Sequence, residues 1–182
     1  SFAHLRTYVQ QINILEKYTT AYLQLASPNS TRIGAFDLAV SPDGNYLYAP
    51  WYGYRALQKF NTSDLSLANQ GNAGVQSYAV AVSPDGNRVY VTNTGPGNRI
   101  LQTFDASTLS LIGTTPVGID PDSVAVSPDG NYVIVANSGS HTVQLGGSTV
   151  SVAGVNTMGL AVSPDGGYVY ASSSNAVSSN NG

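Results

Sequence analysis

The sequence predicts an all-β fold, a β-propeller with four blades of four antiparallel strands, and three observations carry that prediction. The tetrapeptide Ser-Pro-Asp-Gly occurs four times, each time after an Ala-Val pair, at intervals of 42, 44 and 36 residues. Such a period suits one four-stranded propeller blade. Between these motifs, apolar and polar residues alternate over short runs bounded by Gly, Asn, Asp and Pro, which is the pattern of strands and turns. No segment shows a convincing helical period of 3.6 residues.

The repeated tetrapeptide is expected to form the turn between the first two strands of each blade. Proline presets φ, aspartate can accept a hydrogen bond from its own backbone two residues on, and glycine tolerates a positive φ. We therefore interpret the acidic and glycine residues of the motif as structural turn residues, not as metal ligands or catalytic acids. They are Asp43, Gly44, Asp85, Gly86, Asp129, Gly130, Asp165 and Gly166.

Each complete repeat predicts four strands. In the best-defined repeat these are residues 78–82, 89–92, 100–104 and 109–113. The first strand is small or apolar throughout, as expected of a strand buried on both faces near the propeller axis. The outer strands carry polar side chains such as Lys59 and Gln102, for which we expect a solvated rim.

Alignment of the repeats predicts a single domain over residues 1–174, followed by a polar tail at 175–182. Three blades occupy about 36–77, 78–121 and 122–153, and the last of these is short around residues 144–148, which predicts a clipped outer hairpin. Residues 14–25 align with the outer strands of later repeats. The sequence thus predicts a fourth blade shared between the chain ends, with residues 1–35 supplying its outer strands and residues 154–174 its inner strands.

The closure of this shared blade has three possible forms. A propeller normally removes its free strand edges by joining its first and last strands. Exchange of terminal strands between copies would instead give a homo-oligomer or an open polymer. The third form is a longer propeller of which this chain is a part, since the sequence begins without Met and ends in the polar tail.

Composition narrows the classes of partner. Charged residues make up 9% of the chain and the net charge is −3, so no basic surface for nucleic acid is expected. No apolar run is long enough to predict membrane insertion. A surface rich in hydroxyl and amide groups is typical of extracellular or cell-surface proteins, and Asn29 and Asn61 begin candidate N-glycosylation sequons.

The sequence carries few groups that could perform catalysis. The chain has two histidines and no cysteine, and it lacks a nucleophile elbow and a phosphate-binding loop. We therefore expect no enzyme activity, no metal and no cofactor. Asp37, at the start of an innermost strand, is expected to cap that strand, to pair with Arg32 in the preceding loop, or to line the axial opening. The pair Asp120 and Asp122 forms a turn without the ligand spacing of a calcium loop.

One aromatic cluster is the candidate contact surface: Trp51, Tyr52 and Tyr54, followed by Arg55. The corresponding loop elsewhere is rich in Gly and Asn. Aromatic side chains with polar tips favour protein interfaces and the flat faces of sugars. Three roles therefore remain open for this cluster: cover for a blade edge, a contact between subunits, or carbohydrate binding.

The repeat resembles the YVTN-type β-propeller family. Residues 90–93 read Tyr-Val-Thr-Asn, and residues 134–137 and 170–173 are variants of the same motif. The resemblance implies the propeller fold but leaves the function open, because similar propellers occur in surface-layer proteins, lactonase-like enzymes and cofactor-bearing oxidoreductases.

Our functional prediction is a non-enzymatic extracellular or cell-surface structural protein that forms contacts with itself, such as a filament or surface-layer subunit. The alternatives are a module that binds glycan or a surface protein, and a fragment of a lactonase-like or redox enzyme.

Overall fold

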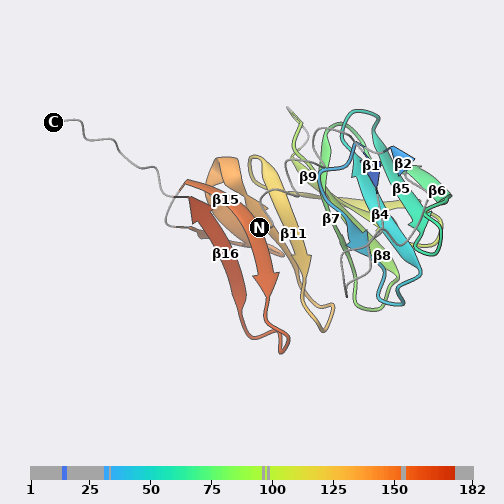
Figure 1. Cartoon of the computed structure of the whole chain (residues 1–182). Coiled ribbons are helices and arrows are strands. Elements are labelled where there is room, and N and C mark those ends of the chain that lie inside the picture. The colour runs from blue at the N-terminus through green and yellow to red at the C-terminus, as the bar shows by residue number, and fades with distance from the viewer. Residues whose placement is uncertain are drawn as a thin grey trace.

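The computed structural model describes residues 14–15, 31–32, 34–95, 97, 99–152 and 155–174. These residues form three four-stranded antiparallel sheets and two two-stranded sheets, which follow one another as blades (Figure 1). The described part of the chain contains no α-helix and no helix that could span a membrane. The predicted all-β propeller fold is confirmed.

Each four-stranded sheet is a meander whose strands pair in chain order. The first sheet contains β3 (Ala39–Val40), β4 (Tyr46–Trp51), β5 (Ala56–Asn61) and β6 (Leu67–Asn72). The second contains β7 (Ser77–Val82), β8 (Arg88–Asn93), β9 (Ile100–Asp105) and β10 (Leu111–Pro116). The third contains β11 (Pro121–Val126), β12 (Val133–Asn137), β13 (Thr142–Leu145) and β14 (Ser148–Ser151). The short turn between β13 and β14 is the clipped outer hairpin expected from the sequence.

The chain ends form the two smaller sheets. One pairs β1 (Ile14–Leu15) with β2 (Thr31–Arg32), and the other pairs β15 (Val155–Val162) with β16 (Val169–Ser174). Figure 1 places these two sheets at opposite ends of the row of blades. Most of residues 1–35, with Asn29, and all of the tail 175–182 lie outside the described residues, so the shared blade stays a prediction.

The Ser-Pro-Asp-Gly turns share one hydrogen-bond network, seen clearly at the β7–β8 turn. The Ser83 hydroxyl donates to Asp85 and accepts from the Arg88 amide at 2.9 Å, while the Asn87 backbone and side-chain amides donate to Asp85 at 3.0 and 2.9 Å. The motif glycines have φ between 72° and 75°. In all four turns the serine hydroxyl is the main cause that lowers the pKa of the aspartate.

Successive turns lie side by side. A Cβ atom placed on Gly86, Gly130 or Gly166 would lie 3.6, 3.7 or 3.6 Å from the proline Cδ of the preceding turn. The four motifs therefore form a row along one end of the blades.

The main core lies between the first and second sheets and is centred on their second and third strands. Its buried side chains include Tyr48, Leu57, Val89, Phe104 and Leu109. The predicted burial of the innermost strands on both faces holds in β7, where Ala79 and Val80 are 2% and 4% exposed and belong to different core clusters. It does not hold in β3, where Val40 is 57% exposed, and β11 is only partly buried.

Two further expectations were wrong for identifiable reasons. Lys59 and Gln102 are 7% and 6% exposed, so neither lies on a solvated rim. The Lys59 ammonium reaches into the junction between sheets and donates to the Ala106 carbonyl oxygen at 2.9 Å, and Gln102 lies in β9, which is paired on both sides. Burial accordingly lowers the pKa of Lys59. The fourth strand of the second sheet begins at Leu111 and not at residue 109, because Leu109 has φ 57° and closes a turn stabilised by the Asp105 carboxylate.

Candidate functional site

The predicted aromatic cluster lies at the β4–β5 turn, at the end of the first sheet opposite the Ser-Pro-Asp-Gly turns. Trp51 ends β4 and forms a bridge to Ala35, and the Tyr52 amide donates to the Gly34 carbonyl oxygen at 3.3 Å. This pairing holds the turn against the segment that leads into β3. Two segments about 16 residues apart therefore present their side chains together.

Five aromatic rings lie here in two contacting groups, one of three rings and one of two, and we call them the aromatic face: Phe36, Tyr52 and Tyr78, and Trp51 and Tyr54. Phe36 stacks on Tyr78 with ring centroids 5.0 Å apart and an interplanar angle of 18°. Tyr52 meets Phe36 edge to face at 5.2 Å and 84°. Trp51 and Tyr54 pack at 4.4 Å with a 46° tilt. Offset-stacked and edge-to-face pairs are the favoured arrangements of aromatic rings.

Gly34 makes the position of Trp51 possible. A Cβ atom on Gly34 would lie 2.1 Å from Trp51 Nε1 and 2.4 Å from Cδ1, which is far inside van der Waals contact. The indole therefore lies directly against the backbone of the adjoining segment. Any larger residue at position 34 would displace it.

The aromatic face is partly open to solvent. Tyr54 is 72% exposed and Phe36 is 48% exposed, whereas Trp51 and Tyr52 are half-buried. Arg55 ends the turn with φ 55° and is exposed. Exposed aromatic side chains that touch one another form an apolar patch with polar rims, which is typical of contact surfaces.

The structure brings together three of the four predicted contact residues and adds two that the sequence reasoning missed. Trp51, Tyr52 and Tyr54 touch other rings of the aromatic face, while Arg55 flanks the turn without a ring contact in the described residues. Phe36 and Tyr78 were missed, although both stand five residues before a repeated serine. Their shared repeat position is the signal that could have identified them.

Asp37 ties the aromatic face to the sheets below it. Its Oδ1 accepts from the Leu38 amide at 2.9 Å and its Oδ2 accepts from the Val80 amide at 3.0 Å. The second bond crosses from the first sheet to the second. Asp37 thus caps the start of its strand, which is one of the roles expected for it, and joins the two sheets where Phe36 meets Tyr78.

The equivalent loop of the third sheet is polar. Ser138 donates through its hydroxyl to Asp122 and through its amide to the Asp120 carbonyl oxygen at 2.8 Å. Burial raises the pKa of Asp122. His141 follows this turn with φ 55°. Within the described residues, no group of three or more His, Asp or Glu side chains is placed to hold a metal ion.

Asn61, the candidate glycosylation residue in the described part of the chain, ends β5. Its side-chain amide donates to the Ser66 hydroxyl at 2.9 Å, and the residue is half-exposed. A glycan at this position remains a prediction.

The comparisons with known proteins address the fold and the family. The chain resembles hydrazine synthase from Kuenenia stuttgartiensis, at 24% identity and a TM-score of 0.72, over 89% of this chain and 47% of that chain. It also resembles a functionally unknown protein from Desulfotomaculum acetoxidans DSM 771, at 18% identity and a TM-score of 0.79, over 90% of this chain and 56% of that one. These likenesses support the fold alone, and the chain spans about half the length of both proteins.

The family assignment comes from a sequence model. No curated protein matches the chain significantly. The model described as "Lactonase, 7-bladed beta-propeller" matches residues 53–147, which is just over half of the chain. The match agrees with a propeller repeat family but is not specific for the YVTN type, and its description counts more blades than this chain has repeats. The chain belongs to the lactonase family of seven-bladed β-propellers.

Proposed function

We propose that this chain serves as a non-catalytic contact module that binds a protein surface through its aromatic face, with a second copy of the chain as the partner. The observation that carries this proposal is a pair of contacting ring groups at one end of two adjacent sheets, each with one exposed member, Phe36 in the first group and Tyr54 in the second. Aromatic side chains are enriched at the centres of protein interfaces because they bury a large area at a low cost in side-chain entropy.

The low net charge of the chain is compatible with a second copy of the chain as the partner. A net charge of −3 on 182 residues gives little repulsion between copies, because the interaction of sparse surface charges is screened within about 10 Å at moderate ionic strength. The rigid support of the rings also favours binding. Gly34 and Asp37 hold their positions through backbone contacts, so fewer degrees of freedom are lost on association.

Sedimentation velocity over a series of chain concentrations tests this proposal. We expect the wild type to associate with rising concentration, and Tyr54→Ser together with Phe36→Ser to abolish that association. Tyr132→Ser is the matched control, since Tyr132 is 52% exposed but follows the Ser-Pro-Asp-Gly turn at the other end of its sheet. A wild type that stays monomeric at every concentration would contradict the proposal.

Carbohydrate binding is the alternative role of the same rings. If the wild type is monomeric and is retained on a glycan surface, and Trp51→Ala abolishes this retention, the ligand of the aromatic face is a glycan. That result would contradict the proposal of a protein partner. The extracellular or cell-surface location inferred from composition belongs to this proposal. It predicts that the mature protein is recovered outside the cell.

Lactone hydrolysis is the second candidate function, and the family match over residues 53–147 favours it. Assay of aliphatic and sugar lactones against their spontaneous hydrolysis tests it. Under the contact-module proposal the chain gives no acceleration.

A further inference from the structure

The two junctions between complete blades differ in how they are filled. At the junction of the first and second sheets, the loop after β9 inserts between the blades. The Ala106 carbonyl oxygen accepts hydrogen bonds from the Tyr48 hydroxyl at 3.0 Å and from Lys59 Nζ at 2.9 Å. Ala106 and Leu109 of this loop are buried in the core. This junction is therefore filled by the side chain and carbonyl group of Ala106 and by the side chain of Leu109.

The next junction has the donor but not the loop. Tyr90 occupies the place of Tyr48, because each pairs with the alanine before the last residue of its innermost strand. The corresponding loop of the third sheet is reduced to the tight turn at Gly146 and Gly147, which joins Leu145 to Ser148. No segment equivalent to residues 106–109 exists there. Among the described residues, the Tyr90 hydroxyl has no hydrogen-bond partner.

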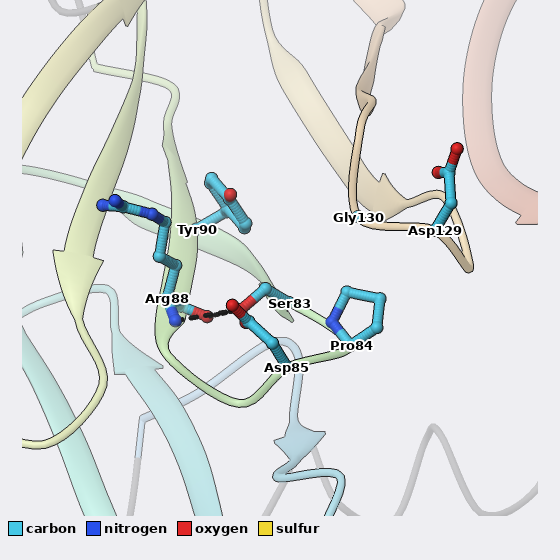
Figure 2. A pocket seen from close by; sticks show the side chains of 7 residues that line it. All are labelled: Ser83, Pro84, Asp85, Arg88, Tyr90, Asp129 and Gly130. Atoms are coloured by element: carbon cyan, nitrogen blue, oxygen red, sulfur yellow. Dashed lines mark hydrogen bonds between the residues drawn. The ribbon is translucent and has the colours of Figure 1, made fainter.

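A cleft of about 380 Å³ lies at this place. It is lined by Ser83, Pro84, Asp85, Arg88, Tyr90, Asp129 and Gly130, and Figure 2 shows Tyr90 and Arg88 on one side and Asp129 on the other. The cleft thus opens where the shortened hairpin leaves the second sheet uncovered. It lies at the end of the blades opposite the aromatic face.

The charges around the cleft favour a neutral ligand that both accepts and donates hydrogen bonds. Tyr90 supplies a donor, as Tyr48 does at the preceding junction. Thr103 takes the repeat position of Lys59, and Arg88 supplies the second donor from the start of β8. Asp85 and Asp129 add two carboxylates at the rim, which would repel an anion. A peptide group meets both demands, because its carbonyl accepts and its N–H donates.

We infer that this cleft binds a short peptide segment with a small side chain, in the way that residues 105–109 fill the preceding junction. The carbonyl oxygen of the segment accepts from Tyr90 and Arg88, and an N–H of the segment donates to Asp129. A following apolar side chain packs where Leu109 packs one blade earlier. This site is independent of the proposed contact function and would recruit a flexible chain segment of a partner.

Titration of the whole chain with a neutral capped peptide, residues 104–110 with Asn in place of the aspartate (Phe-Asn-Ala-Ser-Thr-Leu-Ser), followed by amide NMR spectra, tests this inference. We expect the amides of Ser83, Arg88, Tyr90 and Gly130 to shift. Tyr90→Phe removes only the hydroxyl and should weaken binding by about three- to tenfold, the effect of one hydrogen bond. Tyr132→Phe, an exposed tyrosine outside the cleft lining, is the matched control and should leave the affinity unchanged.

A peptide in which Trp replaces the alanine should not bind, because Ala106 is almost fully buried in the filled junction. The inference is overturned if the peptide leaves these four amides unshifted, or if Tyr90→Phe binds it as tightly as the wild type. It is also overturned if N-acetylglucosamine shifts the same amides and the peptide does not, since the cleft would then be a polyol site.

Discussion

The hydroxyl of Tyr48 donates a 3.0 Å hydrogen bond to the carbonyl oxygen of Ala106, and this bond joins two blades through residues 58 positions apart in the sequence. Burial raises the pKa of Tyr48 to about 12, so the phenol remains a donor throughout the neutral range. Blades in this chain are therefore held together by specific polar contacts as well as by apolar packing.

Tyr48→Phe should lower the free energy of unfolding by about 1 kcal/mol, because it removes one buried hydrogen bond while Lys59 still satisfies the Ala106 oxygen. Chemical denaturation followed by circular dichroism measures the change. Tyr90→Phe is the matched control at the same repeat position. Its hydroxyl has no partner in the described residues, so we expect a much smaller loss, and equal losses in the two variants would contradict this account of the junctions.

Gly167→Asn should stabilise the chain by about 0.5–1 kcal/mol. The other three turns carry Asn45, Asn87 or Asn131 here, and each donates a side-chain hydrogen bond to the turn aspartate at 2.7–2.9 Å. A Cβ atom at position 167 would lie 3.4 Å from its nearest neighbour, an Asp165 oxygen. Thermal denaturation measures the gain, and Asn87→Gly should give a loss of similar size. A destabilised Gly167→Asn would refute the shared design of the turns.

Acid should destabilise the chain through the turn aspartates. Hydrogen bonds from the serine hydroxyls lower the pKa of Asp43, Asp85 and Asp129 below the ordinary value of 3.8. The unfolded chain therefore binds more protons than the folded chain in acid, and stability is lost as the pH falls below about 4. Denaturant midpoints between pH 6 and pH 2 measure this loss.

Two variants serve as controls for this predicted loss of stability in acid. Asp85→Asn should flatten the loss at low pH, because one group with a lowered pKa is gone. Burial raises the pKa of Asp122, so its protonation favours the folded chain, and Asp122→Asn should steepen the loss. The same slope in both variants would show that the turns are not the source of the acid sensitivity.

Gly34→Ala should change the fluorescence of Trp51, the one tryptophan of the chain, because the new Cβ would overlap the indole. We expect a red-shifted emission maximum as the ring moves into water. Gly53→Ala, two residues after Trp51, has no atom within 4 Å of the new Cβ and should leave the emission unchanged. An unchanged spectrum in Gly34→Ala would mean that Trp51 does not lie against Gly34.

The sequence predicts the blades well because a repeated turn fixes both register and spacing. Its failures come from contacts between blades. Lys59 reads as a rim residue from its charge, but the Ala106 carbonyl in the next blade draws it inward. Leu109 reads as a strand residue from its apolar character, but the Asp105 turn gives it a positive φ.

In the candidate site, too, the features that the sequence did not predict depend on contacts between blades. The run of aromatic residues at 51–54 is visible in the sequence, whereas the stacking of Phe36 on Tyr78 depends on how two blades meet. The cleft beside Tyr90 could not be predicted from the sequence either. The sequence predicted the clipped hairpin, but that this hairpin uncovers a tyrosine emerges only when the two junctions are compared.

Hydrogen–deuterium exchange of the chain at low and high concentration tests the proposed contact function most directly. The proposal predicts that, at high concentration, slower exchange is confined to the segments that carry the aromatic face, residues 34–38, 51–55 and 76–79. Slower exchange at other segments, or the same exchange at both concentrations, would contradict the proposal that the aromatic face is where copies of this chain meet.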